Sequence, residues 1–214
     1  MSVPVALMVG LGALATSCST GAPEETLADD FLCQLPTPAA RDAVLKAVGA
    51  DEVSTTIFAR PSTLVQRVED DLRHWTTEKG ALPTDVCLFQ RVAGEPGGSV
   101  RISFQWATPE KGKVAGRPLR DARRYVVNGL PAEANEGDAK LSFSCVMPGD
   151  LRGASRQAQL VGWVALTGGP RQGLQSDGDV RHVTLAYLMA QRAVEALGCE
   201  NEPLRGEPVV KPGT

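Results

Sequence analysis

Histidine is scarce in this 214-residue chain, which contains only His74 and His182. The chain also lacks the HExxH, G-x-S-x-G, S-x-x-K, P-loop and G-x-G-x-x-G patterns of metalloproteases, serine hydrolases and nucleotide-binding sites. A Ser-His-Asp triad could still assemble from residues that are distant in sequence, but no local context singles out a serine. We therefore expect both histidines at surface or helix-boundary positions on predicted helices, and we predict no catalytic residue.

Spacings typical of metal sites are missing as well. No two cysteines form a C-x2-C pair, and neither histidine is adjacent to a cysteine. Glu69, Asp70 and Asp71 are consecutive, so they point in different directions around a helix. Residues 176–179 (S-D-G-D) begin like a calcium loop, but the acidic residue required at the twelfth position falls on Leu188. We expect residues 176–179 to form a turn and N-cap, and we predict no metal and no cofactor.

Neither sign of charge dominates the chain. It has 22 Lys and Arg against 25 Asp and Glu, a net charge of −3, which argues against a nucleic-acid-binding protein. A content of 43% hydrophobic and 22% charged residues excludes a disordered chain, while 22 Gly and 15 Pro indicate many turns. The composition is that of a folded globular protein.

Only one long hydrophobic run is present, from Val3 to Leu14, and small residues follow it up to Cys18. About twelve apolar residues are too few to span a bilayer, which takes about 20, but they match the apolar region of a secretory leader. Pro4, Gly10 and Gly12 disfavour the alternative of a buried helix. Because small residues precede the cysteine, the segment resembles a bacterial lipobox. We expect residues 1–17 to be a signal peptide and Cys18 to be lipidated, with plain cleavage after a small residue as the alternative.

Four further cysteines remain, and an even number outside the cytosol indicates two disulfides. They are Cys33, Cys87, Cys145 and Cys199. Three pairings are possible. We favour Cys33–Cys87 with Cys145–Cys199, because each bridge then ties an element to its own half of the chain.

The mature chain divides into three parts. Residues 18–30 carry the lipidated cysteine and a polar stretch with little to bury, which predicts a flexible tether. Residues 31–200 have the length and pattern of one domain. Residues 201–214 contain Pro203, Pro208 and Pro212 and are expected to be an irregular tail.

Three helices are predicted in the domain. The first has Thr37 as N-cap, Pro38 as first residue and Gly49 as terminator. The second begins with Ser62 as cap, and its apolar stripe follows helical spacing. That stripe consists of Val65, Val68, Leu72 and Trp75. The third runs over residues 180–197 and ends before Gly198.

Strands are predicted where the hydrophobic period is two. The ranges are 54–59, 86–92, 100–107, 123–128, 141–147 and 159–167, with turns at 93–98 and 131–139. Consecutive strands between helices indicate an α+β fold with a twisted antiparallel sheet of five to six strands, packed against two to three helices. Trp75, Trp106 and Trp163 fall on apolar stripes or strand centres, and we expect them in the core.

Several short motifs resemble those of small secreted lipoproteins of actinobacteria. These are the leader ending in Cys18, Cys33-Gln34-Leu35-Pro36 before a helix, cysteines in strands, and the closing Ala196-Leu197-Gly198-Cys199. The chain is also similar to the extracellular sensor domain of a mycobacterial serine/threonine kinase. This resemblance implies an α/β sandwich with two disulfides around a groove and a location at the cell envelope.

A cluster of positive charge is the most suggestive polar feature. Six cations lie within residues 111–124, with Asp121 as the only acid among them. They are Lys111, Lys113, Arg117, Arg120, Arg123 and Arg124. Anionic partners outside the cell would be lipid headgroups or phosphate-bearing wall polymers. A solvated loop followed by the exposed side of a strand would explain the same residues without a ligand.

These observations predict a lipid-anchored, monomeric module on the extracytoplasmic face of the cell membrane, which binds or senses and has no enzymatic activity. Its partners would be the membrane, through the N-terminal lipid, and an envelope protein or anionic wall polymer. The alternatives are an envelope-acting hydrolase, which would need a cleft with a histidine or paired carboxylates, and a purely structural envelope protein.

Overall fold

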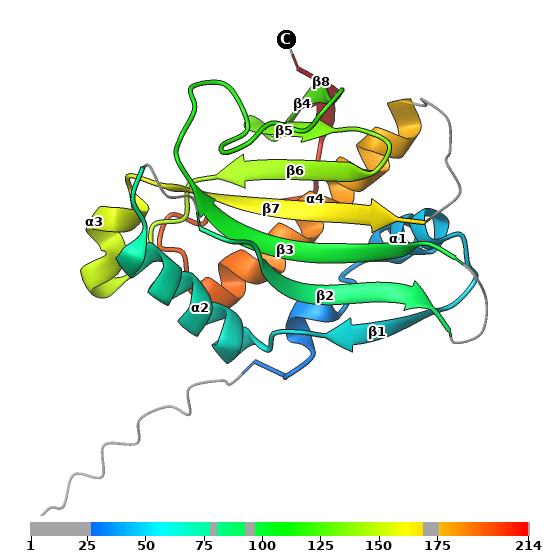
Figure 1. The fold of residues 1–214 in the computed structure, drawn as a ribbon, viewed down its shortest axis with the longest axis horizontal. Helices are drawn as coiled ribbons and strands as arrows, with labels where there is room; N and C mark the ends of the chain where they lie inside the picture. Colours follow the sequence, from blue (N-terminus) through cyan, green and yellow to red (C-terminus); the bar gives the residue numbers. More distant parts are fainter. Residues whose placement is uncertain (1–26, 78–80, 93–96, 169–175, 214) are drawn as a thin grey trace, which may run out of the picture.

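A computed structural model of the chain describes residues 27–77, 81–92, 97–168 and 176–213. The predicted signal peptide (1–17) and Cys18 lie outside the described residues, as does the first part of the tether. Over the described residues the fold is α+β, with four α-helices and one antiparallel sheet of eight strands (Figure 1).

Capping residues set the ends of the helices. Helix α1 (Pro38–Val48) begins where the Thr37 side chain accepts a hydrogen bond from the N–H of Ala40, 3.1 Å away, and ends at Gly49, whose φ is 70°. Helix α4 (Ser176–Leu197) ends before Gly198, with φ of 62°. Both ends agree with the sequence, because a left-handed residue after a helix is most easily glycine.

Helix α2 (Pro61–His74) begins two residues earlier than predicted. Its N-cap is Arg60 instead of Ser62, without a side-chain cap, and Pro61 is its first residue. Leu64, Val68 and Leu72 are buried. Trp75 lies just beyond the last turn and is half-buried. Proline fits the first helical position because its missing N–H has no partner there in any case.

Three short helical segments were not predicted. They are the 3-10 turns η1 (Phe31–Cys33) and η2 (Gly149–Leu151), and the one-turn helix α3 (Arg152–Ser155).

All eight strands belong to one sheet, in the order β1-β2-β3-β7-β6-β5-β4-β8. In chain order they are β1 (Val53–Ile57), β2 (Thr84–Arg91), β3 (Ser99–Ala107), β4 (Arg123–Val127), β5 (Leu130–Ala134), β6 (Asp138–Phe143), β7 (Gln159–Thr167) and β8 (Val210–Pro212).

The prediction of five to six strands was wrong because β5 and β8 were taken for a turn and an irregular tail. Strand β5 has the sequence L-P-A-E-A, which contains no β-branched or aromatic residue. Strand β8 has only three residues in a proline-rich stretch, yet it pairs with β4 from Tyr125 to Val127. The sheet therefore continues beyond residue 200, and residues 201–214 are not wholly irregular.

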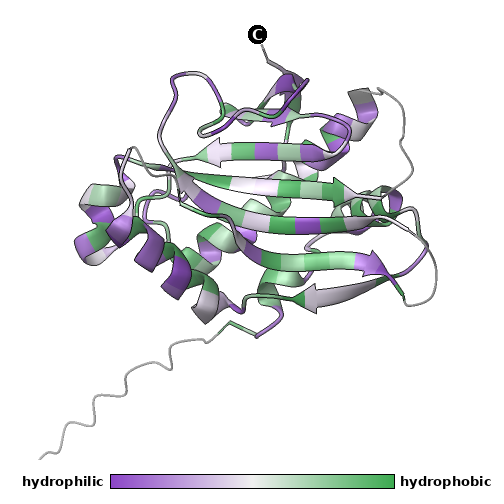
Figure 2. Cartoon of the chain, in the orientation of Figure 1, coloured by the Kyte–Doolittle hydropathy of each residue, from purple (hydrophilic) through white to green (hydrophobic). Residues whose placement is uncertain are grey.

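Helices α1, α2 and α4 cover one face of the sheet, which we call the inner face (Figure 1). The predicted face of β3, formed by Val100, Ile102, Phe104 and Trp106, is buried there. The Trp106 ring N–H donates to the backbone oxygen of Val68 in α2, 2.9 Å away, which ties helix and sheet together. Strand β3 alternates hydrophobic and hydrophilic residues, because side chains of successive residues point to opposite faces (Figure 2).

Two disulfides join the layers, with the pairing favoured from the sequence. Cys33–Cys87 links η1 to β2, and Cys145–Cys199 links the segment after β6 to the end of α4. All four cysteines are buried. The bridges therefore fasten the helical layer to the sheet in each half of the domain.

Candidate functional site

Polar side chains form a row across the outer face of the sheet, the face opposite the helices. Strand register places Arg124 beside Glu133, Glu133 beside Lys140, and Lys140 beside Trp163. Directly opposite residues of antiparallel strands have Cβ atoms about 4.5–5.5 Å apart. Four strands thus bring cation, acid, cation and aromatic ring together, although they are up to 39 positions apart in sequence (163 − 124).

The loop between β3 and β4, residues 108–122, lies over this row and is held at four points. Side chains from β5, β6 and the turn between them bond to its backbone. The bonds are Ala115 N–H to Ser142 Oγ (3.2 Å), Lys140 Nζ to Arg117 O (2.7 Å), Leu119 N–H to Glu133 Oε1 (2.9 Å) and Asn135 Nδ2 to Arg120 O (2.8 Å). Val114 and Ala115 also pack against Ala107 and Val161. The basic loop is therefore fixed to the sheet.

Burial governs the electrostatics of two of these anchors. Lys140 is only 3% exposed, and its ammonium lies 4.6 Å from the centre of the Trp163 ring. Burial lowers the pKa of Lys140, while nearby Glu133 opposes that shift. Burial likewise raises the pKa of Glu133, against the opposing effects of the Leu119 N–H and of Lys140. Each charge thus offsets part of the free-energy cost of burying the other.

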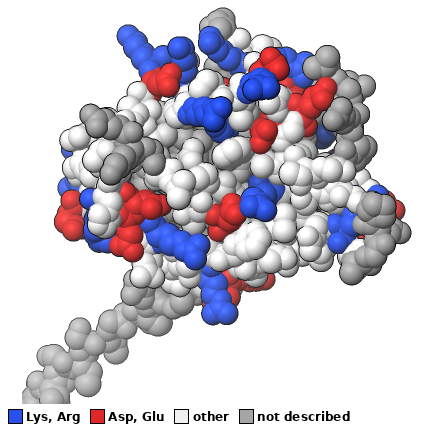
Figure 3. Space-filling view, in the orientation of Figure 1, with Lys and Arg blue, Asp and Glu red and all other residues white. Residues whose placement is uncertain are grey.

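A pocket of about 240 Å³ opens between this loop, strands β4 and β5, and Gly213. Lys113 and Arg124 contribute positive charge to its wall, and Glu110 and Glu133 contribute negative charge. Part of the remaining lining is apolar and consists of Val114, Val126, Ala132, Pro118 and Pro131. Figure 3 shows Lys and Arg side chains gathered over this part of the molecule, with acidic side chains among them.

The six predicted cations do not form one site. Lys113 and Arg124 line the pocket, while Lys111, Arg117 and Arg120 are exposed on the same loop. Arg123 points to the inner face, where its Nε lies 2.7 Å from Oδ2 of Asp179 in α4. This interaction raises the pKa of Arg123. Neighbours in a strand face opposite sides, so Arg123 and Arg124 cannot share a site.

Asp179 is a buried acid for which the sequence predicted only a place in a turn and N-cap. It is 2% exposed, and the Tyr125 hydroxyl donates to Oδ2 from 2.9 Å, beside the Arg123 bond. The S-D-G-D stretch that contains it forms the first turn of α4 instead of a turn before the helix. An acid in the first turn also interacts favourably with the helix dipole.

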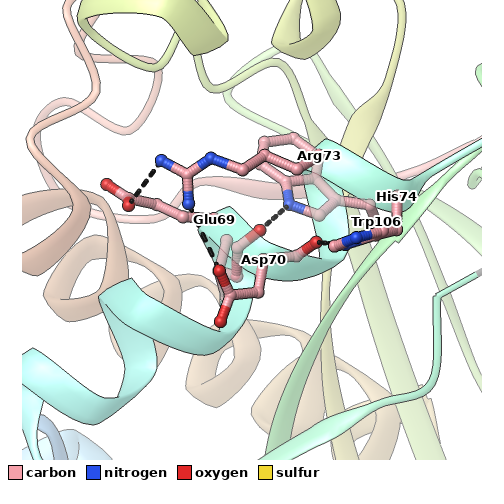
Figure 4. A network of polar contacts seen from close by, with 6 residues as sticks. Glu69, Asp70, Arg73, His74 and Trp106 are labelled. Atoms are coloured by element: carbon pink, nitrogen blue, oxygen red, sulfur yellow. Dashed lines mark hydrogen bonds and ion pairs between the residues drawn. The ribbon is translucent and has the colours of Figure 1, made fainter.

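Neither histidine lines this pocket. His74 is exposed at the end of α2, where Nδ1 lies 2.7 Å from the backbone oxygen of Asp70, and Arg73 pairs with Glu69 and Asp70 (Figure 4). His182 lies in the first half of α4, where burial lowers its pKa. Its Nδ1 is buried without a hydrogen-bond partner.

Two other concave surfaces contain no histidine. One of about 690 Å³ lies beside Cys199 and the end of α4, and one of about 340 Å³ lies beside Asp70, Asp71 and Asp85. Among the described residues no cluster of His, Cys, Asp or Glu is arranged to hold a metal ion. No helix within the described ranges is both long and apolar enough to cross a membrane.

Comparisons with protein-family models, with curated proteins and with solved structures found no match to this chain.

Sequence reasoning missed the anchors of the loop. Glu133 and Asn135 fell within a predicted turn, and Lys140 preceded a predicted strand. Trp163, expected in the core, is half-buried on the outer face beneath Lys140. The alternation through Lys140, Leu141, Ser142 and Phe143 was the available signal, because it places Lys140 and Ser142 on one face.

Proposed function

We propose that this protein is a lipid-anchored binding module on the extracytoplasmic face of the cell membrane, without catalytic activity, and that its pocket takes an anionic, phosphate-bearing ligand. The observation that carries the proposal is the fixed loop over the pocket. Four side-chain bonds to the loop backbone hold the loop in place beside a pocket that both Lys113 and Arg124 line, so the loop loses little conformational entropy when an anion binds there.

Two further features support the extracytoplasmic part of the proposal. Buried disulfides are common in oxidising compartments and rare in the cytosol. The leader up to Cys18 and the resemblance to secreted actinobacterial lipoproteins are consistent with the same location.

The shared chemistry of the ligand is a phosphate group, on a lipid headgroup or on a wall polymer. We expect calorimetry to detect binding of glycerol phosphate, and flotation to detect binding to phosphatidylglycerol vesicles but not to phosphatidylcholine vesicles. Vesicle binding alone would identify a membrane surface, and binding of both probes would identify the phosphate group itself. Binding to exposed cations should weaken as salt is added.

The variant Lys113→Gln/Arg124→Gln should lower the affinity for these phosphate-bearing probes about tenfold or more, because both residues line the pocket. Arg41→Gln/Lys46→Gln is the matched control, since it removes the same charge from α1 on the inner side of the sheet. Equal losses in the two variants would contradict a pocket site and would indicate an effect of net charge alone. No binding of either probe would favour a purely structural protein.

The lipid anchor is tested by mass spectrometry of the protein isolated from its native membrane. We expect a mature N-terminus at Cys18 that carries acyl mass, and a Cys18→Ala variant released from the membrane. An unmodified Met1 would overturn both the anchor and the proposed location. An envelope hydrolase would release product from cell-wall material, and we expect no such release.

A further inference from the structure

The two edges of the sheet differ in how they resist pairing with another chain. Strand β8 has three residues, two of which are Lys211 and Pro212, and both residue types discourage strand addition. Strand β1 at the other edge has five residues, V-S-T-T-I, without charge or proline. It pairs with β2 on one side, and within the described ranges no strand pairs with its other side (Figure 1).

One hydrogen bond shows which backbone groups of β1 point away from the sheet. The Phe58 N–H donates to the Val86 oxygen in β2, 2.8 Å away. Because the direction of hydrogen bonding alternates along an antiparallel strand, Thr56 and Ser54 also face β2. Val53, Thr55 and Ile57 therefore direct their N–H and C=O groups away from the sheet.

The surroundings of this edge are apolar at one end and carry opposite charges at the two ends. Ile57 and Phe58 are each 41% exposed. Glu52 is exposed before the strand, and Arg60 follows it. The Arg60 guanidinium pairs with Asp29 at 3.3 Å, but its side chain is 65% exposed, so this contact is weak.

We propose that β1 pairs antiparallel with β1 of a second copy of this chain, with Thr55 on the two-fold axis. In this register Val53 faces Ile57 of the partner, and every outward-directed residue exchanges two hydrogen bonds with its opposite. Glu52 then lies diagonal to the partner's Arg60, within reach of long side chains. A parallel pairing would instead place acid beside acid. The sheets of both copies become continuous, which replaces the monomer expected from the sequence.

The test is the dissociation constant of the dimer, measured by sedimentation equilibrium on the full chain with both disulfides formed. Thr55→Lys should raise the dissociation constant at least about tenfold, because it places two like charges opposite each other at the axis. Thr56→Lys is the matched control. It adds the same charge to the same strand, but its side chain faces Ser54 of the partner, and its effect should stay within about threefold.

Cross-linking gives a second readout that does not depend on affinity. In a Cys18→Ser background, Thr55→Cys should form a disulfide-linked dimer under mild oxidation, because Cα atoms about 5.5 Å apart suit a disulfide. Thr56→Cys should remain monomeric, since the two Cα atoms would be more than about 7 Å apart. A monomer at all concentrations would overturn the proposal, and so would a dimer that Thr55→Lys leaves intact.

Discussion

Arg123 and Arg124 are adjacent in the sequence but act on opposite sides of the molecule. Arg123 joins Asp179 and Tyr125 on the inner face, and Arg124 faces the pocket on the outer face. The sequence predicted a cluster of cations here. It could not predict which of the two faces the inner side, because that depends on which face of the strand the helices cover.

Lys140 is the residue whose replacement tests the fixed loop. Lys140→Met keeps a long side chain but removes the donor to the Arg117 oxygen and the cation near Glu133. We expect the free energy of unfolding to fall by about 1–3 kcal/mol in urea titrations, the cost of leaving buried polar groups unpaired. Lys113→Met, at an exposed position, should change it by less than about 0.5 kcal/mol. Equal stability of Lys140→Met and the natural chain would show that this anchor does not hold the loop.

His182 should make stability depend on pH in the mildly acidic range. Burial sets its folded-state pKa below the ordinary value of 6.5, against the opposing effect of Asp179, while Arg181 lowers it further. Between these two pKa values the unfolded chain binds more protons, so stability should fall as pH drops below about 6.5.

Urea unfolding between about pH 5 and pH 7.5 checks this dependence on His182. His182→Gln should remove part of the fall in stability at acidic pH, whereas His74→Gln, at the exposed end of α2, should retain that fall. An identical pH profile for His182→Gln and the natural chain would contradict the assignment.

Among the elements, those with a strong local signal were predicted well. Thr37 and Gly49 bound α1, Gly198 ends α4, and Gln159–Thr167 forms β7 as expected. Strand β5 was missed because its stability comes from pairing with β4 and β6 and not from its own residue types. The anchored loop was missed for a similar reason, since its partners lie on strands that approach only after the sheet has formed.

Gly162 is a position in β7 where the sheet and helix α4 leave little room for a side chain. A Cβ there would lie 3.2 Å from Phe104 Cε1 and 3.7 Å from the Ala190 Cβ. Gly162→Ala should therefore lower the free energy of unfolding by about 1–3 kcal/mol, because the layers must separate slightly. Gly153→Ala in α3 is the control, since no atom lies within 4 Å of its Cβ position, and it should be neutral or stabilising by up to about 1 kcal/mol. A neutral Gly162→Ala would mean that Phe104 can move without cost.

At the scale of the whole molecule, the two disulfides close loops of equal length. Each joins cysteines 54 positions apart, so the chain-entropy treatment assigns each bridge about 4 kcal/mol of stabilisation. Cys33→Ala/Cys87→Ala and Cys145→Ala/Cys199→Ala should thus destabilise the protein to a similar extent in urea. If one pair cost several kcal/mol more than the other, local packing around that bridge would outweigh loop closure.

The last described residue, Gly213, has a practical consequence for any ligand-binding assay. It lines the pocket, its N–H donates to the Arg124 oxygen 2.8 Å away, and an added Cβ would lie 3.0 Å from the Arg124 backbone. An affinity tag or fusion partner attached after this residue would leave the fold at the rim of the pocket. A polyhistidine tag there would place imidazoles, which carry positive charge below about pH 6.5, beside Lys113 and Arg124, so protein for binding work should be purified without one.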